Sequence, residues 1–301
     1  MTEPLRLAYF PGCSAHGTGR ELDRSTRRVC QALGIELREL DDWSCCGATA
    51  AHAIGGELHV QLCAPTLAQA AELGLDLLTP CAACFHNLAT AARVLDPTAA
   101  DREDGGEWSG AGEHPEPLPA PVRVWSLPEL LATAPVLERV ASRVARPLAE
   151  LSLVAYYGCL LVRPPEITGV SDPENPLAID TVGQACGATV IDWPYKTRCC
   201  GGGLFVSHPD LVAELSGPLV AMARRVGADC IVTACPICHA NLESHQWRQQ
   251  RAARGTQDRR TLPVLYLSEL VGLALGLDGE DWWRGHLVDP RPIAARPEVS
   301  P

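Results

Sequence analysis

The chain has 301 residues, of which 47% are hydrophobic and 20% charged, and its formal net charge is −11 at pH 7. This length is enough for two ordinary domains, and the composition is that of a soluble globular protein. The negative charge argues against nucleic acid as a partner and against electrostatic binding to anionic lipid. No stretch approaches the roughly 20 apolar residues of a membrane span, and residues 1–6 lack the layout of a signal peptide. We therefore expect a cytoplasmic protein with no transmembrane segment.

Cysteine is abundant, with 14 residues in the chain. In a reducing compartment this number does not indicate a disulfide framework, so the first expectation is metal binding. Four of the cysteines recur after a constant interval of 154 residues: Cys45, Cys46, Cys81 and Cys84 are repeated as Cys199, Cys200, Cys235 and Cys238. The glycine after the adjacent pair and an asparagine near the last cysteine recur at the same interval: Gly47 with Gly201, and Asn87 with Asn241.

A fifth cysteine precedes each set. Cys13 and Cys159 lie 146 residues apart and follow similar sequences, because the second copy has eight more residues before its adjacent pair. Each half thus reads Cys … Cys-Cys-Gly … Cys-x-x-Cys-x-x-Asn. The repeat predicts two domains, the first over residues 1–150 and the second over residues 151–301.

The predicted elements alternate between strand and helix in both halves. In chain order, the first half has a strand at 7–10, a helix at 21–33, a strand at 35–40, a helix at about 59–73, a strand at 76–79 and a helix that begins at Cys-x-x-Cys. The second half repeats this order with a strand at 153–157, a helix at 177–186, a strand at 189–193, a helix at 210–226, a strand at 230–233 and another helix from Cys-x-x-Cys. A last strand and helix around residues 127–130 recur around 267–270.

This alternation predicts an α/β fold of two tandem pseudo-symmetric Cys-Cys-Gly domains, with small parallel sheets flanked by helices. The cysteines would lie at the C-terminal edges of the strands. The halves differ mainly at residues 96–121, an extra stretch rich in Gly, Pro, Asp and Glu, which predicts a flexible surface insertion.

The cysteine pattern favours an iron–sulfur cluster in each half. A Cys-x-x-Cys at a helix start lowers thiol pKa, but such pairs also occur in zinc sites and redox dithiols. Adjacent cysteines point to opposite faces of extended chain, so they suit two irons of one cluster better than one ion. Five cysteines per half exceed the four of a zinc site or an ordinary cubane, and soft thiolates suit iron–sulfur clusters.

With these motifs the sequence resembles the B subunit of heterodisulfide reductase over nearly its whole length. The second half is especially similar at residues 156–159 (Tyr-Tyr-Gly-Cys), 192–196 (Asp-Trp-Pro-Tyr-Lys) and 235–239 (Cys-Pro-Ile-Cys-His). The resemblance implies two noncubane [4Fe–4S] clusters. It implies one ligand set of Cys13, Cys45, Cys46, Cys81 and Cys84 and a second of Cys159, Cys199, Cys200, Cys235 and Cys238.

The resemblance also implies an enzyme subunit that cleaves or forms a disulfide between the two clusters, each of which supplies one electron. The chain has no ferredoxin-type cysteine run and no Gly-x-Gly-x-x-Gly loop. A ferredoxin-like C subunit and a flavin-containing A subunit are therefore the expected partners, with a disulfide or thiol as substrate. Two other functions stay open: an electron-transfer iron–sulfur subunit of a quinone-linked dehydrogenase, and a zinc-stabilised scaffold.

Several other residues are candidates for the site. His239 and His86 lie close to the last cysteine of each set and either donate a proton to a released thiolate or pack in the fold. Asn87 and Asn241 either hydrogen-bond to cluster sulfur or cap a loop, and Gly47 and Gly201 are expected to let the backbone pass close to a cluster. Weaker candidates are His16, His52, Lys196 and Arg198. The last two either attract an anionic substrate, tune the cluster potential or are simply solvated charges. The remaining cysteines are expected to be buried packing residues: Cys30, Cys63, Cys186 and Cys230.

Overall fold

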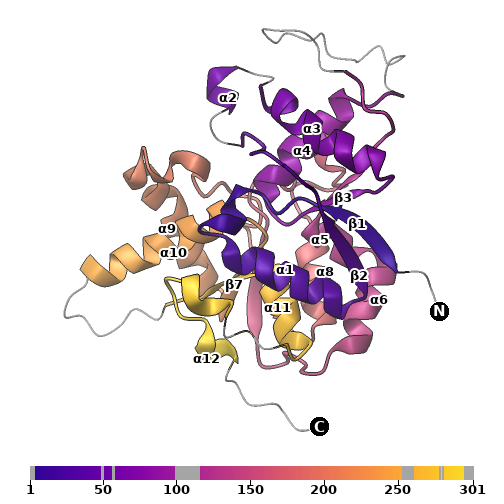
Figure 1. Ribbon diagram of the computed structural model, residues 1–301. Coiled ribbons are helices and arrows are strands. Elements are labelled where there is room, and N and C mark those ends of the chain that lie inside the picture. The colour runs from indigo at the N-terminus through magenta and orange to yellow at the C-terminus, as the bar shows by residue number, and fades with distance from the viewer. Residues whose placement is uncertain are drawn as a thin grey trace.

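The computed structural model describes residues 4–48, 51–55, 58–98, 116–252, 261–277, 279 and 281–294. Figure 1 shows the described parts of residues 1–150, the first half, and of residues 151–301, the second half, packed closely against each other. Each half contains one parallel sheet with helices around it. The predicted α/β fold with two small parallel sheets is confirmed.

The first half follows the predicted order of elements. Its elements are β1 (Leu5–Tyr9), η1 (Cys13–His16), α1 (Arg20–Ala32), β2 (Ile35–Glu39), α2 (Ala51–Ile54), α3 (Leu58–Glu72), β3 (Leu77–Thr79), α4 (Ala82–Val94), β4 (Val124–Ser126), α5 (Leu127–Ala132) and α6 (Ala134–Arg143). α1 shows why this region is helical: Leu22, Thr26 and Val29 are buried at spacings of three and four residues, with charged residues on the opposite face. Gly34, at a φ of 69°, reverses the chain into β2.

The second half repeats this order. Its elements are β5 (Ser152–Tyr156), α7 (Pro165–Thr168), α8 (Ala178–Ala185), β6 (Thr189–Val190), η3 (Gly202–Phe205), α9 (Pro209–Arg225), β7 (Cys230–Thr233), α10 (Pro236–Ala252), β8 (Val264–Tyr266), α11 (Leu267–Ala274), η4 (Trp283–Gly285) and α12 (Arg291–Ala294). The sequence did not predict α6 or α7. The short α7 lies in the Pro-rich stretch of eight extra residues, where Pro165 starts a helical turn instead of breaking one.

The strand order changes direction at the centre of each sheet. The first sheet has the order β2-β1-β3-β4 and the second β6-β5-β7-β8, with every pair parallel. From the first strand of each sheet, the chain therefore turns to one side and then to the other. In open α/β sheets, ligands bind beyond the strand ends at this switch point. The switch points lie between β1 and β3 and between β5 and β7.

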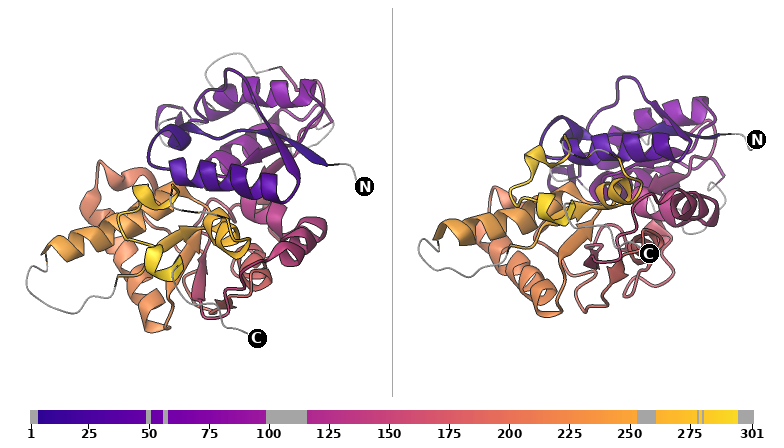
Figure 2. Two further views of the ribbon diagram at one scale, coloured as in Figure 1. Left: turned by 60° about the horizontal axis from the view of Figure 1, so that its bottom comes forward. Right: turned by 90° about the horizontal axis from the view of Figure 1, so that it is seen from below.

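The two halves pack reciprocally. The first helix of the first half, α1, contacts the last helix of the second sheet unit, α11, while α5 contacts α8 in the same way. Figure 2 shows the first half lying along the second in both views. Ser25 on α1 and Ser268 on α11 share a buried hydrogen bond of 2.7 Å across this interface. The boundary between residues 150 and 151 stays a prediction.

The predicted insertion lies only partly within the described residues. Residues 99–115 fall outside them. Of the described remainder, Leu118 is buried, and its amide donates a hydrogen bond to the Leu95 carbonyl at the end of α4. The second end of this stretch is therefore anchored on the first half.

Candidate functional site

Both sets of five cysteines lie at the switch points of the sheets. In the first half, Cys13 follows β1 and Cys81 follows β3, so the two loops emerge side by side at the C-terminal edge. In the second half, Cys159 and Cys235 follow β5 and β7 in the same way. The Cys-Cys-Gly loops complete each group. We call these groups the first thiol set (Cys13, Cys45, Cys46, Cys81, Cys84) and the second thiol set (Cys159, Cys199, Cys200, Cys235, Cys238).

The cysteines of the first thiol set converge. The Sγ atoms of Cys46 and Cys84 are 3.4 Å apart, and those of Cys13 and Cys45 are 4.0 Å apart. Cys81 interacts with Cys84 through its thiol, which joins it to the same group. Cys13 and Cys45 are exposed, whereas the other three are buried. The first set therefore has three buried thiols and two thiols that are accessible to solvent.

The second thiol set has the same arrangement. The Sγ atoms of Cys200 and Cys238 are 3.6 Å apart. Cys235 interacts with Cys238, and Cys159 with Cys199. Cys200, Cys235 and Cys238 are buried, while Cys199 is exposed and Cys159 half-buried. The repeated cysteines of the sequence thus have the same arrangement in both halves, with two accessible thiols in each half.

Hydrogen bonds between thiols shift the pKa values within each set in opposite directions. A hydrogen bond from the Cys159 thiol lowers the pKa of Cys199 to about 6, and one from Cys238 lowers the pKa of Cys200 to about 7. In the first set, burial and the neighbouring Cys45 raise the pKa of Cys13 to about 11. Groups with opposed pKa shifts in one cluster are typical of functional sites, and thiolates are the form that binds metal.

The glycines after the adjacent cysteines contact sulfur through their amides. The amides of Gly47 and Gly201 donate hydrogen bonds to the sulfurs of Cys45 and Cys199, both at 3.4 Å. Both glycines have positive φ, 74° and 98°. A Cβ at Gly47 would lie 2.6 Å from Ala51, and one at Gly201 would lie 3.0 Å from Val212, so helix packing limits the space on that side of each glycine.

Two other glycines approach the sulfurs directly. A Cβ at Gly12 would lie 2.9 Å from the Sγ of Cys84, and one at Gly158 would lie 3.1 Å from the Sγ of Cys238. Both have positive φ and directly precede the first cysteine of their set. Sequence reasoning did not select them as site residues, although their position before Cys13 and Cys159 was the available signal.

The two repeated asparagines lie beside the adjacent cysteines. The Asn87 side-chain amide donates to the Cys46 carbonyl at 2.8 Å. The Asn241 amide lies 3.3 Å from the Cys200 carbonyl, 3.4 Å from the Cys200 sulfur and 3.0 Å from the Gly202 carbonyl. Asn87 therefore holds the loop, and Asn241 both holds the loop and contacts a sulfur.

The candidate histidines occupy different surroundings. His86 is half-buried on α4. His239 is buried, stacks on Tyr266 with ring centroids 4.4 Å apart, and places its Nε2 atom 3.3 Å from Nδ1 of His286. Burial lowers the pKa of His239. The structure thus joins His239 to His286, a residue that sequence reasoning did not select. His16 stacks on Trp43, and the side chain of His52 lies outside the described residues.

Lys196 is neither a solvated charge nor a free substrate-attracting one. Its side chain is 6% exposed, and its Nζ lies 2.9 Å from Oδ1 of Asp180 and 2.9 Å from the Asn175 amide oxygen. The Lys196 carbonyl accepts hydrogen bonds from the amides of Tyr157 and Gly158. The expectations of a solvated or a substrate-attracting charge are corrected: Lys196 is a buried ion-pair partner that holds the segment before Cys159. Arg198, in contrast, is exposed and lies over the Tyr195 ring.

The four cysteines outside the thiol sets are buried, as predicted: Cys30, Cys63, Cys186 and Cys230. Burial raises the pKa of Cys30 to about 12 and that of Cys186 to about 12. Neutral, buried thiols of this kind behave as small apolar residues.

The two thiol sets meet at the interface of the halves. The amide of Ala82, which follows Cys81, donates a hydrogen bond of 3.2 Å to the carbonyl of Ala234, which precedes Cys235. In the repeat-related bond, the amide of residue 236 would donate to the carbonyl of residue 80. Residue 236 is proline and has no N–H, so this bond cannot form. Gly19, just after the Cys13 turn, also packs against Pro236. The two Cys-x-x-Cys motifs are therefore direct neighbours.

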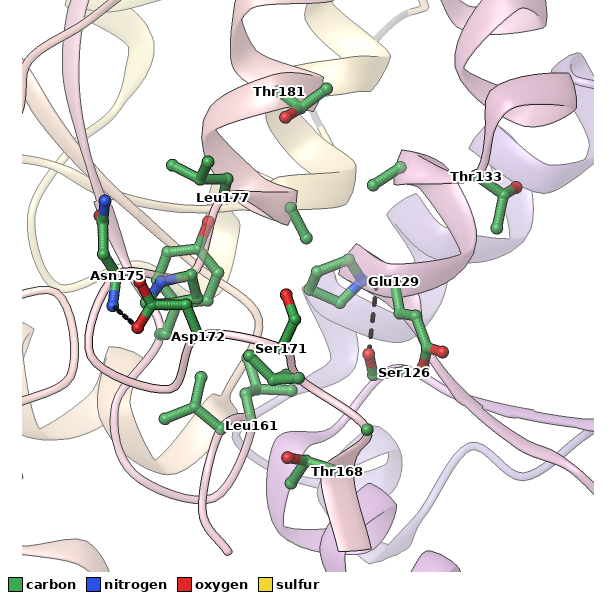
Figure 3. A pocket seen from close by; sticks show the side chains of 18 residues that line it. Ser126, Glu129, Thr133, Leu161, Thr168, Ser171, Asp172, Asn175, Leu177 and Thr181 are labelled. Carbon is green, nitrogen blue, oxygen red and sulfur yellow. Dashed lines mark hydrogen bonds between the residues drawn. The ribbon is translucent and has the colours of Figure 1, made fainter. Parts of the chain in front are cut away.

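A cavity of about 480 Å³ also lies between the halves. Figure 3 shows Ser126, Glu129 and Thr133 of the β4–α5 region on one side and Leu161, Leu177 and Thr181 of the second half on the other. Tyr157 and Leu161, which flank Cys159 in the chain, line this cavity. A ligand in it would touch the segment that positions Cys159.

The strand order and the paired thiol sets define a two-domain, cysteine-rich α/β protein. The chain belongs to the CCG family of cysteine-rich domains, whose model matches residues 7–89 and 153–243. Domains of this family typically bind iron–sulfur clusters. The donors fit such a group, since each half offers five soft thiols and a glycine cradle that a Cβ would fill.

The relatives come from two kinds of reductase. The chain is 31% identical to the 8-methylmenaquinol:fumarate reductase membrane anchor subunit of Wolinella succinogenes, over 94% of this chain and 96% of that protein. It is 29% identical to the B subunit of the ferredoxin/F420H2-dependent CoB–CoM heterodisulfide reductase of Methanosarcina acetivorans, over 92% and 91% of the two chains. The predicted resemblance to the B subunit of heterodisulfide reductase is confirmed.

One solved structure supports the fold alone. A hypothetical protein from Helicobacter pylori superposes with a TM-score of 0.61 at 14% identity, over 93% of this chain and 51% of that one. Within the described part of this chain, we find no helix with the length and apolar character needed to cross a membrane.

Proposed function

We propose that this protein is the catalytic subunit of a heterodisulfide reductase-like complex that cleaves or forms a disulfide. The first and second thiol sets would each hold one noncubane [4Fe–4S] cluster. When bound, each cluster would supply one electron of the two that a disulfide requires. The relationship to the B subunits of heterodisulfide reductases supports this proposal over a general redox role.

The observation that carries the proposal is the direct contact between the two Cys-x-x-Cys motifs. The hydrogen bond from Ala82 to Ala234 makes the two sets neighbours, and each set has two accessible thiols. A substrate disulfide has two sulfur atoms, each of which leaves as one thiol, so two similar sites side by side suit its two halves. A single-electron carrier needs only one such site.

The reaction balances with an external electron source. A disulfide takes up two electrons and two protons as its S–S bond breaks and yields two thiols; the reverse reaction forms the bond. We propose a ferredoxin-like C subunit and a flavin-containing A subunit as the electron source, in the cytoplasm. For protons, we propose His86, which is half-buried two residues after Cys84. His239 is already engaged with His286.

The test is an electron paramagnetic resonance experiment on anaerobically purified, oxidised protein. Adding a thiol substrate such as coenzyme M or coenzyme B should produce a new paramagnetic signal, and adding a disulfide to the reduced protein should reoxidise it. Protein that contains iron but responds to neither compound would contradict a disulfide-converting role.

A second function has its own support, namely electron transfer in a quinone-linked dehydrogenase. The relative from Wolinella succinogenes is named as a subunit of a menaquinol-dependent reductase. The cavity beside Cys159 has an apolar side formed by Leu161, Val162 and Leu177, which suits a ring compound. Reoxidation of the reduced protein by a soluble quinone, together with no response to thiols, would favour this function.

A further inference from the structure

A group of buried ligand-type side chains lies outside both thiol sets. His239 and Glu243 project from successive turns of α10, and His286 comes from the segment after η4. Their side chains are 7%, 1% and 0% exposed. We call these three residues the His-Glu-His group. His286 follows Glu243 by 43 residues in the chain, so the fold alone brings it to the other two.

The spacing of the three ligand atoms is that of one coordination sphere. Nε2 of His239 lies 3.3 Å from Nδ1 of His286 and 3.7 Å from Oε1 of Glu243, and these last two atoms are 3.2 Å apart. Zinc binds nitrogen and oxygen at about 2.0–2.1 Å in a tetrahedron, whose edges are then about 3.3–3.4 Å. The triangle therefore has the size of one tetrahedral face.

The other polar atoms of the group are already occupied. Nε2 of His286 lies 3.0 Å from Oε1 of Glu269, and the second oxygen of Glu243 accepts a hydrogen bond of 2.6 Å from the Leu287 amide. His239 also hydrogen-bonds to the backbone at Val264. Metal-binding histidines are usually held in this way, with the second nitrogen on a carboxylate or a carbonyl.

From this geometry we propose that His239, Glu243 and His286 bind one divalent transition-metal ion, for which Zn²⁺ is the best fit, separate from both thiol sets. Two histidines and a carboxylate form a borderline donor set that suits zinc. Two buried carboxylates, Glu243 and Glu269, face the group and favour a bound cation. Water would complete the coordination.

The ion would fasten the C-terminal segment, which also contacts the first half, to α10. Residues 281–294 cross over α1, where the Arg24 guanidinium donates to the Asp281 carbonyl and Glu21 packs against Gly285. A cavity of about 470 Å³ lies beside the group and offers a metal ion a route to it. Its lining residues are Trp283, Arg284, His286, Asp289 and Arg291. Metal binding would thus couple the segment to α10, the helix that carries Cys238 and begins directly after Cys235.

The same residues also permit a metal-free arrangement. Although burial opposes it, Glu269 and Glu243 raise the pKa of His286 to about 10. A protonated His286 between two carboxylates would satisfy the group without a metal, and the experiment separates the two states by detecting the metal itself.

The test is metal analysis of the anaerobically purified full chain after incubation with Zn²⁺ and desalting. We expect about one zinc per chain in addition to the iron. Zinc X-ray absorption distinguishes its location: the proposal requires nitrogen and oxygen neighbours at about 2.0–2.1 Å, whereas zinc in a thiol set would show sulfur at about 2.3 Å.

Three variants complete the test. Glu243→Gln and His286→Gln should lose at least about ten-fold in zinc affinity while iron and sulfide content stay unchanged. His208→Gln, an exposed histidine on another helix end, should keep the zinc. Protein without zinc, zinc with sulfur neighbours, or full zinc in both variants would each overturn the proposal. Because iron content and the thiol-induced signal are read separately, failure here leaves the proposed disulfide function standing.

Discussion

Gly12 and Gly158 bring the backbone close to the sulfurs of Cys84 and Cys238. Each has positive φ and leaves no room for a side chain next to Cys84 or Cys238. Each glycine therefore contributes to the site in two ways: it adopts a backbone conformation that other residues disfavour, and its missing Cβ leaves space for the sulfur. The sequence could show where these glycines lie, but not which sulfur they touch, because that cysteine comes from a distant helix.

Gly158→Ala should lower the iron content of the protein by reducing cluster binding in the second half. The added Cβ would lie 3.1 Å from Sγ of Cys238. Gly227→Ala is the matched control, because Gly227 has a φ of 83° and no atom within 4 Å of the added Cβ. The control should lose about 1–2 kcal/mol of stability and keep its iron. Iron analysis with chemical denaturation measures both; equal iron loss in the two variants would contradict a role for the sulfur contact.

Cysteine reactivity should follow the pKa values. In metal-free protein at about pH 7.5, Cys199, with a pKa of about 6, is largely thiolate, whereas Cys30 and Cys186, with pKa values of about 12, remain protonated. Iodoacetamide should therefore modify Cys199 at least about 100-fold faster, since the thiolate is the nucleophile. Peptide mass spectrometry follows the rates. If Cys30 in the folded protein were modified at a comparable rate, the conclusion that Cys30 is buried and protonated would be contradicted.

Among the elements, the strands and helices that carry cysteines were the most predictable. Apolar runs such as 153–157 and 230–233 became β5 and β7, because a parallel sheet covered on both faces needs continuous apolar strands. The short α6 and α7 were not predicted. Pro135 and Pro165 each stand in the first turn of these helices, where the missing N–H of proline costs no helical hydrogen bond.

The loop before the second Cys-Cys pair depends on a buried ion pair that composition could not reveal. Lys196 and Asp180 form this pair, and the Tyr157 hydroxyl donates to the same carboxylate at 2.6 Å. Sequence reasoning treated Lys196 as a surface charge, because the partner on α8 is recognisable only once β5, β6 and α8 are assembled. The pair connects the segment before the Cys-Cys-Gly loop to α8 and, through Tyr157, to the segment between β5 and Cys159.

Lys196→Met should destabilise the protein by about 3–5 kcal/mol, because it leaves the Asp180 carboxylate buried without its cation. Arg6→Met is the control: its ion pair with Glu36 is exposed, so its loss should cost no more than about 1 kcal/mol. Denaturant unfolding measures both free energies. A Lys196→Met protein as stable as the control would mean that the ion pair does not hold this loop.

For the whole molecule, the sequence repeat predicted two sites but not their contact. The 154-residue interval shows that each half builds its own thiol set, since the same residues recur in the same order. The packing of α1 on α11 and of α5 on α8, and the bond from Ala82 to Ala234, arise from surfaces that have no shared motif. His286 joins His239 for the same reason: long-range contacts depend on the assembled fold.

The most direct test of two independent, adjacent cluster sites is the iron and sulfide content of the anaerobically purified protein beside two single variants. The wild-type chain should carry about eight irons, four for each cluster. Cys46→Ser and Cys200→Ser should each retain about four, because each removes a ligand of its own set only, and each should abolish disulfide turnover because both sites are required. Iron near four in the wild type, loss of all iron in either variant, or normal turnover in both would contradict the account.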